Sequence, residues 1–224
     1  TLMSIIDEIL DTSKIESGRL DLERSPFELS TLAESVIELL APRAHAKGIE
    51  ISCRVTGNVP SIIIGDETRI RQVLFNICGS AIKSTERGAV SPFIDYDGKA
   101  KALTMDVADT GIGLSPGETS HIFNEYAQAN SNTTRRFGGT GLGLSISRKL
   151  IEGMGGKISV TSKLGRGSKF SITLPYARDD DGELQTKPLL GRSYELAAPA
   201  GPIRQHLEAL IAELGASARI ITSD

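Results

Sequence analysis

The sequence contains little that would serve nucleic-acid binding. It has no tryptophan, and aromatic residues make up only 4% of its 224 residues, so it lacks the stacking surfaces that single-stranded nucleic acid requires. Its net charge of −3 provides no positive field to recruit nucleic acid or anionic lipid. We therefore expect no nucleic-acid partner, and any phosphate group must be bound by local basic residues.

Cysteine is also scarce. Cys53 and Cys78 are the two cysteines, and they lie far apart in patterns that do not resemble metal sites. This usage favours two small buried thiols in a reducing compartment. We therefore expect a cytoplasmic location.

Neither a membrane-spanning segment nor a secretory leader is found. No apolar run approaches the roughly 20 residues that cross a bilayer, and no signal peptide precedes Thr1. We expect no membrane contact from these residues. Because the chain opens inside a predicted helix, a membrane anchor upstream in a longer protein is compatible with the sequence.

An amphipathic helix is predicted at the start of the chain. Ser17-Gly18 provides a stop signal, and the apolar residues that recur at helical spacing are Leu2, Ile5, Ile6, Ile9 and Leu10. The narrow apolar stripe suits a helix in a bundle or a dimer. From the pattern alone, a helix lying on its own domain is equally compatible.

Helical and strand periodicities alternate from Phe27 onward. They predict helices over residues 29–46, 68–83, 116–125 and 142–154. Strands are predicted over residues 49–55, 62–64, 90–96, 102–108, 157–161 and 168–174. Residues 130–139 are polar and rich in glycine, which indicates a mobile loop. The pattern predicts an α/β sandwich, in which helices cover one face of a mixed sheet.

The composition changes at Ala177. The next residues are charged and contain glycine and proline, so we predict a linker over residues 178–190. A strand (194–197), a helix (203–214) and a strand (218–222) follow. Residues 191–224 therefore read as a truncated, flavodoxin-like βαβ start.

A glycine-spaced turn follows the predicted strand 102–108. It reads Asp109-Thr110-Gly111-Ile112-Gly113. The glycines allow a tight turn and leave room for a flat ligand. A carboxylate at the end of a strand can accept a hydrogen bond from an exocyclic amine. Alone this pattern is weak, because many turns share it.

A second glycine-rich segment runs directly into a helix. It reads Phe137-Gly138-Gly139-Thr140-Gly141-Leu142-Gly143-Leu144. Free N–H groups and the positive end of the dipole at a helix start bind phosphate. The segment is neither a dinucleotide-binding βαβ turn nor a P-loop, and a plain connector remains compatible with it. Arg135 and Arg136 just before it could pair with phosphates.

The helix over residues 68–83 has a polar face as well as an apolar one. Gln72, Asn76, Ser80 and Lys83 share that polar face. The Asn76 amide and the Ser80 hydroxyl supply the oxygen ligands that Mg²⁺ prefers, and Lys83 can meet a phosphate. Taken alone, the helix pattern favours a plain solvated polar face.

Together, these three elements resemble one family. Their order and spacing are similar to the N box and two glycine boxes of the histidine-kinase ATPase domain, the Bergerat ATP-binding fold. Ile122-Phe123-Asn124-Glu125-Tyr126-Ala127-Gln128 resembles its phenylalanine box. The resemblance covers about residues 27–176 and places the ATP-binding catalytic domain at residues 21–177. The segment over residues 133–156 is similar to the form seen in hybrid sensor kinases.

The resemblance implies a role for each matching residue. Asp109 would recognise the adenine amino group, with Ile112 against the ring. Asn76 and Lys83 would act in catalysis, with Asn76 and Ser80 at the Mg²⁺ position. The remaining ATP-binding positions would be Gly111, Gly113, Tyr126, Arg135, Arg136, Gly139, Thr140, Gly141, Leu142, Gly143 and Leu144. The implied reaction transfers the ATP γ-phosphoryl group to a histidine, mostly by positioning and charge neutralisation.

Two residues depart from the family pattern. Ser80 stands where the family has a second asparagine, a main Mg²⁺ ligand, and Ser84 stands where it has phenylalanine or tyrosine near the base. Serine is a shorter ligand, and Ser84 offers less apolar contact. An alternative is therefore a degenerate domain that binds nucleotide or transmits a signal without efficient transfer. Related ATP-hydrolysing enzymes carry a glutamate where Asn76 stands, which disfavours hydrolysis.

The resemblance also implies partners. Residues 1–20 are similar to the end of the second helix of the dimerisation hairpin, so the full protein would be a homodimer. None of His45, His121 and His206 lies in the family's acceptor pattern, which places the acceptor histidine upstream and makes these three structural or exposed. A response regulator or receiver domain would take the phosphoryl group.

The C-terminal segment resembles the start of a receiver domain. A working receiver has acidic residues just after its first strand to hold Mg²⁺. Here that stretch reads Tyr194-Glu195-Leu196-Ala197-Ala198-Pro199-Ala200, with no acid after the strand. The resemblance therefore implies a pseudo-receiver with a regulatory role.

Overall fold

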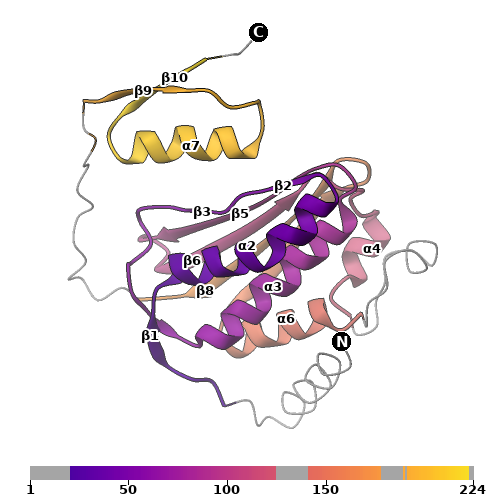
Figure 1. Ribbon diagram of the computed structural model, residues 1–224. Helices are drawn as coiled ribbons and strands as arrows, with labels where there is room; N and C mark the ends of the chain where they lie inside the picture. The colour runs from indigo at the N-terminus through magenta and orange to yellow at the C-terminus, as the bar shows by residue number, and fades with distance from the viewer. Residues whose placement is uncertain (1–20, 125–140, 178–188, 190, 222–224) are drawn as a thin grey trace.

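The computed structural model describes residues 21–124, 141–177, 189 and 191–221 (Figure 1). Its helices are α2 (Leu29–Ala46), α3 (Glu67–Ser84), α4 (Pro116–His121), α6 (Gly143–Gly153) and α7 (Pro202–Glu213). Its strands are β1 (Ser25–Phe27), β2 (Ile49–Ile51), β3 (Arg54–Val55), β4 (Ile63–Gly65), β5 (Gly88–Asp97), β6 (Ala102–Asp109), β7 (Lys157–Lys163), β8 (Gly167–Pro175), β9 (Ser193–Leu196) and β10 (Ser217–Ile220).

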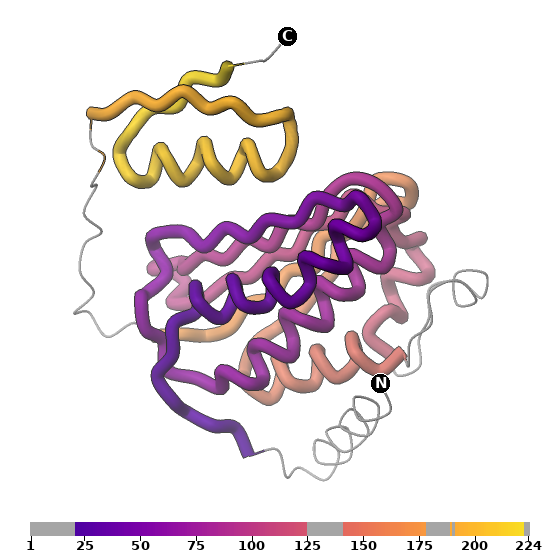
Figure 2. The backbone as a smooth tube through the Cα atoms, viewed as in Figure 1, coloured from indigo at the N-terminus to yellow at the C-terminus, as the bar shows by residue number. Residues whose placement is uncertain are grey.

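A mixed sheet with one helical layer forms the main body. The strand order is β2-β5-β6-β8-β7, and β3 also pairs with β5. Helices α2, α3 and α6 cover one face of this sheet (Figure 2), with α3 packed against both of the others. Leu40 of α2, Ile77 of α3 and Leu150 of α6 are 0% exposed, so the core lies between the helices and the sheet. The predicted α/β sandwich is confirmed.

The predicted helices agree with the structure except at one end. Residues 29–46 form α2, and residues 68–83 and 142–154 correspond to α3 and α6 within one residue at each end. The predicted helix over 116–125 is wrong at residues 122–124, because α4 ends at His121; residue 125 lies outside the described residues. The N–H of Asn124 donates to the His121 carbonyl at 2.8 Å, which closes a turn. The predicted helix at residues 2–10 and the loop over 130–139 lie outside the described residues.

The predicted strand over residues 49–55 is interrupted. It forms β2 and β3, separated by Ser52 and Cys53, although both strands pair with β5 in one continuous parallel register. That register places Pro92 of β5 opposite the interruption. Proline has no N–H to donate to the ladder. Pro92 on β5 therefore interrupts the edge strand between β2 and β3. Cys78 is buried as expected, whereas Cys53 at this break is only half-buried.

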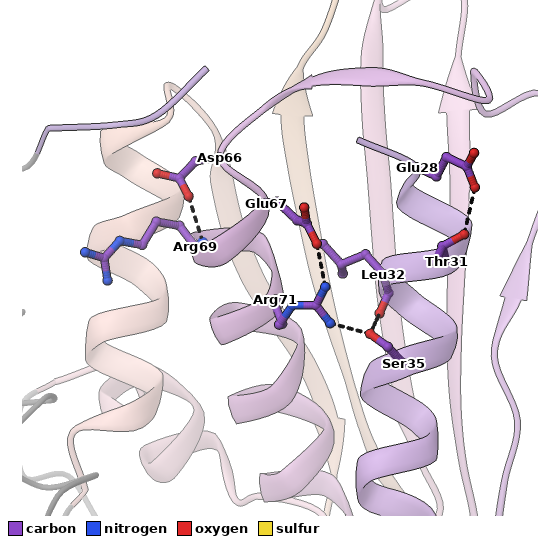
Figure 3. Close-up of polar contacts among 8 residues, drawn as sticks. All are labelled: Glu28, Thr31, Leu32, Ser35, Asp66, Glu67, Arg69 and Arg71. Carbon is purple, nitrogen blue, oxygen red and sulfur yellow. Dashed lines mark hydrogen bonds and ion pairs between the residues drawn. The ribbon is translucent and has the colours of Figure 1, made fainter. Parts of the chain in front are cut away.

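A short strand pair not predicted from the sequence ties the start of the domain to α3. β1 pairs antiparallel with β4, and β4 leads into Asp66, the N-cap of α3. The Asp66 carboxylate accepts from the Arg69 N–H at 2.9 Å (Figure 3) and from the Glu23 N–H at 3.0 Å. One buried side chain therefore caps the helix and holds the chain that enters the domain.

Helices α2 and α3 are joined by a polar bridge near this cap. The guanidinium of Arg71 donates to Glu67 at 2.5 Å within α3 and to the hydroxyl of Ser35 on α2 (Figure 3). Ser35 in turn donates to the Leu32 carbonyl at 2.7 Å. The bridge fixes the relative position of the two helices beside the core.

The C-terminal elements form a βαβ unit. Strands β9 and β10 are parallel and α7 connects them, as the strand–helix–strand pattern predicted. β10 ends at Ile220, short of the predicted end at Thr222, which lies outside the described residues. None of the helices in the described ranges combines the length and the hydropathy of a membrane-spanning segment.

Candidate nucleotide-binding site

The carboxylate of Asp109 occupies the end of β6, at the first glycine box. Asp109 is only 6% exposed. Its Oδ1 accepts from the Gly111 N–H at 2.8 Å, whereas its Oδ2 is buried and has no hydrogen-bond partner among the described residues. Burial raises the pKa of Asp109, and the nearby donor groups of Gly111 and Ser168 offset that rise in part. A buried acceptor without a donor is costly, so this oxygen is suited to a ligand that brings an N–H group.

The two glycines of this box are required by close backbone contacts. A Cβ on Gly111 would lie 2.5 Å from the Ser84 carbonyl oxygen. Gly113 has a φ of +65°, and a Cβ there would lie 2.2 Å from the Lys163 carbonyl oxygen. The Ile112 N–H also donates to the Ser84 carbonyl at 3.2 Å. The turn is therefore held between the end of α3 and the β7–β8 turn.

The side chain of Ile112 remains available at this turn. It is 43% exposed although both of its neighbours are packed against backbone. Its carbonyl accepts from the Gly165 N–H at 2.7 Å, which fixes the backbone from which the side chain projects. An exposed, well-anchored apolar side chain can contact a planar ring.

The structure brings the polar face of α3 to the second glycine box. The amide nitrogen of Asn76 donates to the Gly143 carbonyl at 3.3 Å, and Gly143 begins α6. Because the amide nitrogen makes this bond, the Asn76 oxygen is left to serve as a ligand. Asn76 and Ser80 are half-buried and Lys83 is exposed, so this face is accessible from the solvent.

The start of α6 has the features of an anion-binding helix end. Leu142 at the N-cap is 4% exposed, and among the described residues no side chain caps the helix. Gly141 has a φ of +73°, which brings the chain around in a left-handed conformation favoured by glycine. Leu144 packs against the core. The first N–H groups of α6 therefore lie next to Asn76, where a phosphate would meet them.

Several predicted positions lie outside the described residues: Tyr126, Arg135, Arg136, Gly139 and Thr140. Of the phenylalanine box, residues 122–124 are described. Phe123 is half-buried and makes an edge-to-face contact with Phe170 of β8, with ring centroids 6.1 Å apart. The described part of the box is therefore anchored to the sheet through Phe123.

Ser84 does not extend toward the base position. Its hydroxyl donates to the carbonyls of Ser80 and Ala81, each at 3.1 Å, so it turns back onto its own helix. The Ser84 carbonyl, in contrast, receives the Ile112 N–H. The residue thus contributes its backbone to the turn, while its side chain bonds to its own helix.

Two residues that support the site were missed by sequence reasoning. The Lys47 ammonium donates to the carbonyls of Ile82, Lys83 and Thr85 at 2.7, 3.1 and 3.0 Å, which caps the end of α3. The Thr110 hydroxyl accepts from the Ala89 N–H at 2.9 Å and ties the first glycine box to β5. Both contacts join distant segments, so no local pattern signals them.

The metal position depends on few protein ligands. In the part of the chain that the structure describes, no group of three His, Cys, Asp or Glu side chains could hold a metal ion. The Asn76 oxygen and the Ser80 hydroxyl fit a hard cation only as a partial set. Mg²⁺ would therefore need the phosphate oxygens of a nucleotide and water to complete its shell.

Comparison with known proteins identifies the family. Residues 65–178 match the model described as histidine kinase-, DNA gyrase B-, and HSP90-like ATPase. The sensor histidine kinase GacS of Pseudomonas protegens is 40% identical over 220 residues, which is 96% of this chain and 24% of that protein. The histidine-protein kinase BarA of Escherichia coli K12 is 40% identical over 172 residues, 75% of this chain and 19% of that protein.

Solved structures agree with these relatives. Full-length ShkA in complex with AMPPNP superposes with a TM-score of 0.86 at 33% identity, over 98% of this chain and 45% of that chain. The catalytic domain of the histidine kinase ThkA gives a TM-score of 0.58 at 30% identity, over 68% of this chain and 95% of that chain. The chain spans about a quarter or less of the length of GacS and BarA. This chain belongs to the histidine kinase-, DNA gyrase B- and HSP90-like ATPase family, and its relatives GacS and BarA are sensor histidine kinases.

Proposed function

We propose that this chain is the ATP-binding catalytic part of a two-component sensor histidine kinase. It would transfer the ATP γ-phosphoryl group to a histidine on a dimerisation helix, for relay to a response regulator or receiver domain. The observation that carries this proposal is the buried Asp109 carboxylate, whose Oδ2 has no donor among the described residues. The exocyclic amine of adenine is a donor of the required kind, and the relative ShkA was solved with an ATP analogue.

The chain's own residues divide the work of binding. Asp109 accepts from the base, and Ile112 contacts its ring. The first N–H groups of α6 and the Lys83 ammonium meet the phosphates, while Asn76 fixes the start of α6 through the Gly143 carbonyl. Arg135 and Arg136 would add charge to the phosphates. This division holds the γ-phosphoryl group in place for in-line attack.

Mg²⁺ would sit between α3 and the phosphates. When bound, the cation neutralises charge on the phosphate oxygens. The Asn76 oxygen would be its main protein ligand, with the Ser80 hydroxyl as a weaker one. Because a serine hydroxyl reaches less far than an asparagine amide, we expect a modest dependence of nucleotide affinity on Mg²⁺.

The phosphoryl acceptor would come from another segment of the full protein. His45 and His121 are exposed and lie on α2 and α4, outside both glycine boxes. His206 lies on α7, in the C-terminal unit. A homodimer through hairpins that include residues 1–20 would present the acceptor, and the γ-phosphorus would bond to a ring nitrogen of that histidine as its bond to the bridging oxygen of ADP breaks.

A second candidate function is a regulatory domain that binds nucleotide without efficient transfer. It is favoured by Ser80 at the metal position and by Ser84, whose hydroxyl folds back onto α3. In this function the site would still bind nucleotide through Asp109. Transfer would fail because the metal and the base are held less firmly.

Calorimetry with a non-hydrolysable ATP analogue separates these functions from a site that does not bind. Micromolar binding that strengthens with Mg²⁺ supports the kinase. A phosphotransfer assay on the full protein, or with an acceptor hairpin supplied, then distinguishes the kinase from the regulatory domain. Absence of binding at millimolar nucleotide contradicts both.

A further inference from the structure

The C-terminal βαβ unit rests on an edge of the main sheet. Helix α7 faces β2 and β3, the strands at that edge (Figure 1). The Ile203 N–H, in the first turn of α7, donates to Glu50 of β2 at 2.7 Å. At the other end of the helix, Glu213 forms an ion pair with Arg54 of β3. Both ends of α7 are therefore attached to the same sheet edge.

The chemistry at each end suits this arrangement. Gly201, the N-cap of α7, has no side chain with which to cap the helix, and the Glu50 carboxylate takes that place from the neighbouring strand. The Arg54 guanidinium also lies over the ring of Phe93 on β5, 5.3 Å from its centroid. A residue of the main sheet therefore helps to position the guanidinium. An unpaired sheet edge is covered in this way by a helix.

We propose that this contact is a releasable latch, which holds the C-terminal unit on the β2–β3 edge and opens when His206 takes up a proton. His206 lies on α7 between the two attachment points and is half-buried. Its Nδ1 is buried and has no hydrogen-bond partner among the described residues. The Nε of Arg54 is also buried and lacks a hydrogen-bond partner among them. In the docked arrangement, no acceptor among the described residues lies within hydrogen-bond distance of Nδ1 to receive an imidazolium proton.

Charged groups lie on α7 itself and on the strands that contact it, β2, β3 and β10. Arg54 on β3 and Glu213 on α7 act on it most directly, in opposite senses. Glu208 and Arg204, also on α7, face each other at 3.7 Å. Glu50 on β2 is engaged with the start of α7, and Arg219 on β10 is exposed.

These surroundings disfavour the charged form of His206 while the unit is docked. Burial lowers the pKa of His206, the positive charge of Arg54 lowers it further, and Glu213 opposes the shift in part. On release, the imidazole regains water and loses Arg54 as a neighbour, so the undocked form binds the proton more tightly. Docking is therefore strongest above the ordinary histidine pKa of about 6.5 and weakens as the pH falls below it.

The Ile203 amide offers a direct reporter of the latch. An N–H in the first turn of a helix has no intrahelical acceptor, so its protection from hydrogen exchange depends on Glu50. We would measure this exchange by NMR on the 224-residue chain at pH 7.5 and pH 5.5, after correction for the intrinsic rate. A core amide, Met105 of β6, monitors global unfolding.

The expected result is a loss of Ile203 protection of up to about tenfold at pH 5.5, one pH unit below the ordinary pKa of histidine, with Met105 unchanged. His206→Gln removes this pH dependence, whereas His45→Gln, an exposed histidine on α2, retains it. Glu213→Gln lowers the protection at both pH values.

The proposal is overturned when Ile203 protection does not change with pH, or when the change persists in His206→Gln. Protection that survives Glu213→Gln removes the Arg54 pair from the latch and also overturns it as stated. The measurement needs no nucleotide, so its outcome is independent of the proposed kinase activity.

Discussion

Replacement of Asp109 by asparagine should weaken ATP binding and change the preference for the base. Asparagine is isosteric, so its Oδ1 can still accept from the Gly111 N–H. Its NH₂ group then replaces Oδ2, the oxygen that has no partner among the described residues, and faces the adenine amine donor to donor. The loss of a hydrogen bond to a charged acceptor costs about 1.5–3 kcal/mol, which is roughly a ten- to a hundredfold loss of affinity.

The same change should favour a base that carries a carbonyl at the corresponding position. The asparagine NH₂ can donate to the carbonyl of an inosine nucleotide, to which the Asp109 carboxylate cannot donate. Calorimetry with ATP and ITP analogues measures both affinities for the wild-type chain and for Asp109→Asn. The ratio of ATP to ITP affinity should fall in the variant.

The matched control is Asp106→Asn on the same strand. Asp106 pairs with Lys169 at the surface, at 3.0 Å, and should change neither affinity. Because the base preference is a ratio, it is insensitive to partial unfolding of a variant. An unchanged ratio in Asp109→Asn would refute the assignment of Asp109 to the base.

Three further outcomes are expected. Ser80→Asn should strengthen Mg²⁺-dependent binding of the ATP analogue severalfold, since an amide reaches further than a hydroxyl; unchanged metal dependence would mean that this helix face is only solvated. Gly111→Ala should abolish nucleotide binding because its Cβ would lie 2.5 Å from a backbone oxygen, whereas Gly117→Ala, with nothing within 4 Å, should bind normally. Lys47→Met should lower the free energy of unfolding by about 1–3 kcal/mol by leaving carbonyls of α3 unpaired; thermal unfolding measures this against the exposed Lys157→Met, and equal midpoints would contradict the capping role.

Local patterns predicted the elements that depend on local interactions. In α2, α3 and α6 the apolar residues recur at a spacing that places them on one face only if the segment is helical. The predicted limits of these helices agree with the structure within one residue. The interruption between β2 and β3 could not be predicted in the same way, because its cause is Pro92 on the partner strand. The predicted strand over residues 62–64 corresponds to β4, but its partner β1 was missed because it has only three residues.

For the candidate site, too, the sequence predicted the local motifs but not the contacts between distant segments. The glycine spacing around Asp109 indicated a ligand turn, but the burial of Asp109 and the lack of a hydrogen-bond partner for its Oδ2 among the described residues are properties of the packed structure. The hydrogen bond from Asn76 to Gly143 joins segments separated by 67 residues. Lys47 was missed for the same reason, since its three acceptors come more than thirty residues later, at 82, 83 and 85.

The double attachment of Asp66 has a mechanical consequence. Its carboxylate holds the Glu23 N–H with one oxygen and the first turn of α3 with the other. A pull on the chain before Glu23 therefore acts directly on the helix that carries Asn76 and Lys83, without passing through the sheet. Through the two hydrogen bonds of Asp66, a displacement of the segment at Glu23 is therefore expected to move α3 as well.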